Sequence, residues 1–257
     1  MPSKHIVGSW MQRLRKLLTQ TTAARHSQPR QHPLVYQWTE SAGRSTLPRG
    51  RVRPTRPLPT PTILGLAPIP FDFTMHMRLL CEDIIRRTPE LGHIDLSRVL
   101  LSITRARTRR PYGLQAKVTP MRFKHGKLTQ KRRGWMYQVQ QYYVGNVEML
   151  YLMSFCLPRF LDLPFEEKMI TIVHELFHIA PEFNGDLRRH SGRYYQHSHS
   201  KKKYDQHMHT YVEAYWKTNP DRSLSDFLHH TFEQLHERHG SVQGIIVPVP
   251  KLVPLLG

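Results

Sequence analysis

The sequence has few cysteines, few acidic residues and no long apolar run. Only Cys81 and Cys156 occur among 257 residues, which argues against a disulfide framework and favours a reducing compartment, here predicted to be the cytoplasm. No run of about 18 apolar residues occurs, so no transmembrane segment is predicted. Asp and Glu number 19 against 38 Lys and Arg, and the net charge of +19 indicates contact with a polyanion such as nucleic acid or an anionic membrane surface.

The first 69 residues are rich in arginine and proline and poor in acidic residues. Residues 1–68 contain eleven Lys or Arg but a single acid, Glu40. So little apolar surface is available there that burial does not offset the entropy lost on ordering, and residues 1–69 are predicted to form a flexible basic arm. Three roles for this arm stay open: a solvated tail, a nucleic-acid tether or an organelle-targeting peptide.

The remaining chain predicts one domain, residues 70–240, followed by an apolar tail, residues 241–257. Hydrophobic periodicity and end signals place both helices and strands in the domain. Helices are expected over residues 74–87, 204–217 and 221–240, and strands over residues 99–104, 135–140 and 147–155. Three prolines interrupt the tail, so it is expected to be extended and not helical.

Residues 105–133 form a second basic stretch, with eleven Lys or Arg and no acidic residue. Turn-forming residues divide this stretch, so short strands and hairpin loops are expected. Its basic residues form either a solvated positive face or a groove that binds nucleic-acid phosphates. The rings of Tyr112 and Phe123 are candidates for stacking on bases, and no motif for sequence-specific readout is recognisable.

The clearest motif is His174-Glu175-Leu176-Phe177-His178. With seventeen His and eleven Glu in the chain, the pattern His-Glu-x-x-His is expected by chance roughly 0.05 times. Positions i and i+4 of a helix lie on one face, so the two imidazoles can bind one metal ion while Glu175 reaches a water on that ion. The alternative is a pair of solvated histidines on a surface helix.

The residues around the motif predict a helix over residues 164–180. Pro164 suits the start of a helix, the acidic pair Glu166 and Glu167 falls in the first turn, and Pro181 ends the run. Most of the other side chains are apolar, as in a core helix. Two histidines and a glutamate buried there need partners, because an unpaired buried polar group costs about 1–3 kcal/mol. This burial favours the metal site over the solvated pair.

A third metal ligand has to come from another part of the chain, because catalytic zinc typically has three protein ligands and one open position for water. His190 is the first candidate, since the turn at Asn184-Gly185 can bring the chain back beside the helix end. Three further side chains are alternative third ligands: His197, His199 and Glu213.

The stretch from His174 to His190 resembles the active-site region of a metallopeptidase family found in phages and bacteria, a zincin group similar in layout to SprT-like proteases. The resemblance is close over about residues 160–210 and looser over about residues 70–160. It implies an α+β, zincin-like fold, with a small antiparallel or mixed sheet followed by an active-site helix and C-terminal helices. It also implies Zn²⁺ bound by His174, His178 and His190, with Glu175 as catalytic base.

Further residues are candidates for roles around the metal site, the first of them by the same resemblance. In zincins an edge strand beside the active-site helix pairs with extended substrate backbone, and the strand over residues 147–155 is the candidate for that role. Asp186 is a candidate partner that orients a ligand imidazole. Tyr194 and Tyr195 are candidate hydrogen-bond donors to a developing oxyanion.

The predicted function is therefore zinc-dependent hydrolysis of peptide bonds, with nucleic-acid-associated proteins among the candidate substrates. The rival interpretation is a basic nucleic-acid-binding protein in which zinc is structural. A fourth protein ligand, for instance His197 or His199, would favour the rival, because structural zinc sites leave no open position.

Overall fold

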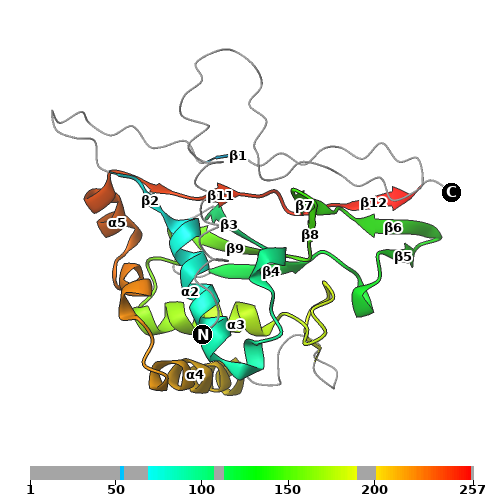
Figure 1. The fold of residues 1–257 in the computed structure, drawn as a ribbon. Helices are drawn as coiled ribbons and strands as arrows, with labels where there is room; N and C mark the ends of the chain where they lie inside the picture. Colours follow the sequence, from blue (N-terminus) through cyan, green and yellow to red (C-terminus); the bar gives the residue numbers. More distant parts are fainter. Residues whose placement is uncertain (1–52, 55–68, 107–112, 190–200, 256–257) are drawn as a thin grey trace, which may run out of the picture.

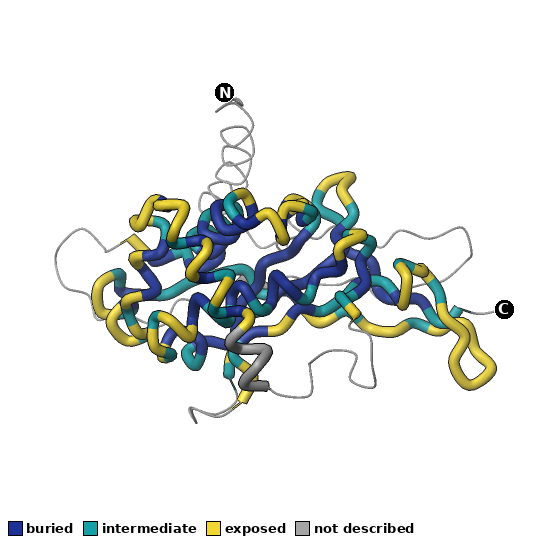
Figure 2. The backbone as a smooth tube through the Cα atoms, turned by 90° about the horizontal axis from the view of Figure 1, so that it is seen from below, coloured by how far each residue is buried: buried dark blue, intermediate teal, exposed yellow. Residues whose placement is uncertain are grey.

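The computed structural model describes the backbone of residues 53–54, 69–106, 113–189 and 201–255, and the side chains of these residues except 53–54 and 201–206. The described part is a mixed α+β structure with small sheets (Figure 1). Buried residues are concentrated in the middle of the described part, and most exposed segments lie at its periphery (Figure 2). The α+β class agrees with the sequence. None of the helices within the described ranges is both long and apolar enough to cross a membrane.

A three-stranded sheet forms the centre of the fold. Its order is β3 (Val99–Arg105), β9 (Tyr151–Leu157), β4 (Ala116–Pro120), with β9 parallel to β3 and antiparallel to β4. Leu101 of β3 pairs with Met153 of β9. Six of the seven β9 residues are buried, as expected for a central strand covered on both faces.

The predicted strand over residues 147–155 is wrong as a single element. Val147–Met149 form β8, which pairs with β7 (Tyr142–Val144) across the predicted turn at Gly145-Asn146. Leu150 lies outside both strands, because its N–H donates to the carbonyl of Arg98 and its carbonyl accepts from Met121 N–H. The chain then continues as β9 in a different sheet.

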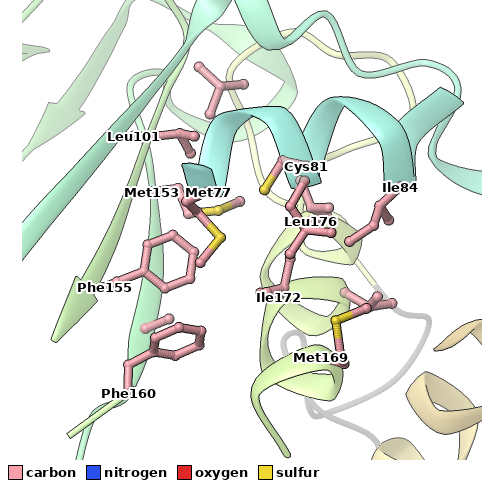
Figure 3. Packing of buried hydrophobic residues seen from close by; sticks show 14 of the residues in the cluster. Met77, Cys81, Ile84, Leu101, Met153, Phe155, Phe160, Met169, Ile172 and Leu176 are labelled. Carbon is pink, nitrogen blue, oxygen red and sulfur yellow. The ribbon is translucent and has the colours of Figure 1, made fainter. Parts of the chain in front are cut away.

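The first helix of the domain, α2 (Phe73–Arg87), has the predicted apolar stripe buried against the sheet. Figure 3 shows Met77, Cys81 and Ile84 directed toward the side chains of β9 and α3. The helix was expected to start at residue 74, but its N-cap is Asp72, which accepts from Met75 N–H at 3.0 Å. The Thr74 hydroxyl instead accepts from the N–H of Ile245 in the tail.

The motif helix is α3 (Phe165–Phe177), with Pro164 as N-cap and His178 as C-cap. Helix α4 (Lys201–Lys217) packs against it. Met169, Ile172 and Leu176 of α3 are fully buried and join the core formed by α2 and the central sheet. Both predicted helices are thus confirmed, with ends shifted by a few residues.

The single helix expected over residues 221–240 is wrong, because the segment breaks into three short pieces. These are η4 (Arg222–Leu224), η5 (Asp226–His229) and α5 (Phe232–His239). The carbonyls of Leu228 and His230 accept from Lys168 Nζ at 2.8 and 2.9 Å, so the chain is held away from α-helical geometry there. Thr231 and Gln234 form a capping box that starts α5.

The tail is extended and its strands pair with other parts of the chain. Its β10 (Val242–Gln243) pairs with β2 (Phe71–Asp72), and its β11 (Ile245–Ile246) pairs with β1 (Arg53–Pro54), a two-residue strand within the predicted arm. Its β12 (Leu252–Leu255) pairs with β6 (Trp135–Val139), which also pairs with β5 (Thr129–Arg132). These last three strands extend from the body on the side away from α5 (Figure 1). The remaining elements are η1 (Pro89–Leu91), η2 (Leu96–Arg98) and η3 (Lys124–Gly126).

The buried Lys168 on α3 predicts a specific pH dependence of stability. Burial lowers the pKa of its ammonium group to about 8, while nearby Asp162 acts in the opposite direction. The unfolded chain holds that proton up to the ordinary pKa of 10.5, so it binds more protons than the folded chain between these values. The free energy of unfolding is therefore expected to rise with pH from about 8 to 10.5.

Chemical denaturation across this pH range measures the contribution of Lys168. Lys168→Met should lose the rise, whereas Lys217→Met, at an exposed position in the last turn of α4, should keep it. A constant stability difference between the wild type and Lys168→Met over the whole range would contradict the prediction.

Candidate metal centre

The two histidines of the motif meet at the C-terminal end of α3. His174 is in the last turn and His178 is the C-cap. Their Nε2 atoms are 2.8 Å apart, with ring centroids 4.5 Å apart and ring planes at 78°. Two Nε2 atoms bound to one tetrahedral zinc at 2.0–2.1 Å would be about 3.3 Å apart. If the two rings moved apart by about half an ångström, one ion could bind to both Nε2 atoms. This pair of donors therefore fits zinc.

Glu175 lies beside this pair and is held by a strand of the central sheet. Its side chain is buried, with 8% of the residue exposed, and its Oε2 accepts from the N–H of Val118 at 2.7 Å. Burial raises the pKa of the carboxyl to about 7, against the opposing effects of the Val118 N–H and the positive charge of Lys117. A carboxyl group with a pKa near 7 can take up and release a proton near neutral pH.

The strand that contacts Glu175 is β4, at one edge of the central sheet. The Gln115 carbonyl, just before β4, accepts from Cys156 N–H of β9 at 2.8 Å. In an antiparallel ladder alternate residues then direct their backbone groups away from the partner strand. Val118, three residues further on, is such a residue, and its N–H meets Glu175. The edge of β4 thus faces the metal end of α3.

The substrate strand predicted over residues 147–155 is contradicted by the sheet order. Residues 151–155 belong to β9, which has β3 on one side and β4 on the other. Its backbone groups are used by these two neighbours, so it has no edge to offer a peptide. β4 has the position that was expected of residues 147–155.

Most candidates for the third ligand lie outside the residues that the structure describes. His190, His197 and His199 lie outside the described residues, as do Tyr194 and Tyr195. Within the described ranges no group of three or more His, Cys, Asp or Glu side chains is arranged to hold a metal ion.

Glu213 belongs to an exposed ionic cluster on α4. Its carboxylate is 3.4 Å from His209 Nδ1, and Nε2 of the same histidine is 2.7 Å from Glu166. Glu166 is in the first turn of α3, about 12 Å of helix rise before His174. The structure therefore does not bring Glu213 into a group with the two histidines.

Asp186 stabilises the loop that follows α3 through several hydrogen bonds. Its carboxylate accepts from the guanidinium of Arg189 at 2.9 and 3.1 Å and from the N–H groups of His125 and Leu187 at 2.8 Å. Burial alone would raise the pKa of Asp186, but these hydrogen bonds hold it below the ordinary value. In the described part of the chain Asp186 therefore stabilises this loop, and its role as partner of a ligand imidazole stays a prediction, since His190 lies outside the described residues.

Two residues that support the site were missed from the sequence. Val118 acts through its backbone N–H, which any residue except proline carries, so its side chain gives no indication of the role. Tyr151 of β9 donates to the Asp186 carbonyl at 2.8 Å and accepts from Gly185 N–H at 3.0 Å, which ties the loop after α3 to the central sheet. A buried tyrosine in a strand is a signal that could have suggested such a hydrogen bond.

Comparison with known proteins identifies a family for this chain. No curated protein and no solved structure shows a significant match to the chain. A family model described as "Putative phage metallopeptidase" matches residues 75–218, which include most of α2 and all of the central sheet, α3 and α4. The match covers more than half of the 257 residues, and the chain therefore belongs to this phage metallopeptidase family.

Proposed function

We propose that the protein is a zinc-dependent peptidase of zincin-like architecture. In this proposal His174, His178 and His190 hold zinc and Glu175 is the catalytic base. The observation that carries it is the pairing of two converging imidazoles, 2.8 Å apart, with a buried carboxylate held against an edge strand. A core helix that only packs against its neighbours has no need of these three polar groups at one end.

Zinc, when bound, lowers the pKa of its water toward 7 and polarises the carbonyl of the bond to be cut. Glu175 accepts the proton of the attacking water and delivers it to the leaving amine. The hydrogen bond from Val118 N–H holds one carboxylate oxygen and leaves the other for proton transfer. The outward backbone groups of β4 that Glu175 leaves, namely those of Ala116 and the carbonyls of Val118 and Pro120, bind extended substrate backbone by strand addition, which accommodates many sequences.

The experiment compares metal content and cleavage in the same preparations of the wild type and His190→Ala. The wild type is expected to contain one zinc per chain and to cleave an unfolded protein. The variant is expected to lose both, because two ligands bind zinc much more weakly than three. Elemental analysis and gel electrophoresis of the cleaved protein supply the two measurements.

Other outcomes separate the alternatives. Zinc and cleavage retained in His190→Ala would move the third ligand to His197 or His199.

Zinc without cleavage in the wild type would favour the rival function, a basic nucleic-acid-binding protein with structural zinc. For that rival the net charge of +19 is the supporting observation, and salt-dependent binding of DNA is its test. Phe123 is buried, with 7% exposed, so its ring is not open to stack on a base.

A further inference from the structure

A basic pocket lies at the end of β4, next to the candidate metal centre. Its volume is about 470 Å³, and it is bounded by the end of β4, the sheet of β5, β6 and β12, and the loop that follows α3. Among its described lining residues, five are basic and one is acidic. These are Arg122, Lys124, Arg132, Arg188, Arg189 and Asp186.

The charges of this pocket are only partly compensated. Asp186 forms a bidentate pair with Arg189, and Glu148 pairs with Arg122. Five cations less these two carboxylates leave a charge of +3. Arg132 donates through Nε to the neutral amide oxygen of Gln130 at 3.2 Å.

Arg188 and Arg122 differ in how their guanidinium groups are bonded within the protein. Arg188 donates Nε to the Phe177 carbonyl at 2.8 Å, with its guanidinium 4.1 Å from the centre of the Phe177 ring. Arg122 has a buried Nε with no hydrogen-bond partner in the part of the chain that the structure describes. A buried donor without a partner is costly, so Arg122 would gain from a further acceptor that reached its guanidinium group.

The pocket is continuous with the edge strand beside Glu175. Thr119 and Pro120, the last residues of β4, line it, and Val118, just before them, contacts Glu175. A strand rises about 3.3 Å per residue, so Pro120 is about 7 Å along the strand from Val118. A peptide that pairs with β4 at the metal centre would therefore reach the pocket within two or three residues of the bond that is cut.

We propose that this pocket binds acidic side chains of the substrate, so that the enzyme prefers proteins with Asp or Glu close to the cleaved bond. The inference rests on the proposed function. Two of its arginines, Arg189 and Arg122, already pair with carboxylates of the protein itself, Asp186 and Glu148. The pocket would bind a substrate carboxylate by the same kind of charged hydrogen bond. Antiparallel pairing with β4 is slightly the more stable arrangement, and it places these acidic residues on the N-terminal side of the bond.

A protein substrate fits the pocket better than nucleic acid does. The aromatic ring in the lining, that of Phe123, is buried and lies 5.5 Å from the Arg132 guanidinium, so it offers no open face for a base. The pocket also begins at a strand edge, which hydrogen-bonds peptide backbone.

The test uses two matched peptides on the zinc-loaded protein. One carries Glu at the second and third positions before the cleavable bond, and the other carries Gln there. The wild type is expected to cleave the Glu peptide with a kcat/KM about tenfold higher or more, as hydrogen bonds to charged groups allow. In Lys124→Gln/Arg132→Gln this ratio is expected to fall to about 1–3. Lys131→Gln, next to Arg132 but on the opposite face of β5, should retain the wild-type ratio.

The outcomes separate failure of the pocket from failure of the proposed function. Equal cleavage of both peptides by the wild type would overturn the pocket and leave the peptidase in place. If neither peptide is cleaved, the proposed function fails, and binding of the labelled peptides decides on the pocket. Tighter binding of the Glu peptide, lost in the double variant, would support it, whereas equal binding would overturn it. Displacement of the Glu peptide by a single-stranded oligonucleotide that binds more tightly would also overturn it, in favour of nucleic-acid phosphates.

Discussion

Replacing Glu175 with glutamine is expected to lower the rate of peptide hydrolysis by about 10²–10⁴-fold, the usual contribution of a general base. Glutamine has nearly the same shape and can occupy the same buried site, but it has no basic oxygen to accept a proton. The two imidazoles remain, so zinc content should stay at that of the wild type. Initial rates on a peptide substrate and elemental analysis measure the two quantities.

Glu167→Gln is the matched control, because Glu167 lies on the same helix but is exposed in its first turn. It should hydrolyse at the wild-type rate. Full activity of Glu175→Gln would remove Glu175 from the role of base. Loss of zinc together with activity would show that the residue acts on the structure of the site.

Replacing either histidine of the motif with alanine is expected to remove zinc from the protein. The Nε2 atoms of His174 and His178 are 2.8 Å apart, and in the proposed site each ring supplies one of the three ligands. Without one of them, zinc stoichiometry should fall well below one per chain, and hydrolysis should fall to the rate without enzyme. Metal analysis after gel filtration and the peptide assay measure both.

His209→Ala provides the comparison on a neighbouring helix. His209 pairs with Glu166 and Glu213 at the first turn of α3, away from the metal end. This variant should retain one zinc and the wild-type rate. A His174→Ala or His178→Ala protein that retains stoichiometric zinc would contradict the assignment of these residues as ligands.

The helices near the site were largely predictable because their patterns are local. The apolar stripe of α2 and the apolar run of α3 have helical periodicity, and Pro164 and the acidic first turn indicate where α3 starts. The segment over residues 221–240 failed because side chains far along the chain decide its shape. Lys168, about 60 residues earlier, binds the two carbonyls that interrupt it.

The arrangement of strands was not predictable by the same reasoning. Burial explains why residues 151–157 form a strand, but an apolar strand has the same composition at the centre of a sheet as near its edge. β3 and β4 are brought to opposite sides of β9 by long-range pairing. The edge position of β4, and with it the contact from Val118 to Glu175, therefore needed the structure.

Removing zinc from the protein and then restoring it tests directly whether peptide hydrolysis depends on the metal. The protein is stripped with a chelator, and cleavage of an unfolded protein is measured before and after one equivalent of zinc, with Glu175→Gln in parallel. The stripped wild type is expected not to cleave and to recover cleavage on adding zinc, whereas the variant is expected not to recover, which excludes a contaminating protease. Cleavage that persists without zinc, or that is equal in the variant, would contradict the proposed function.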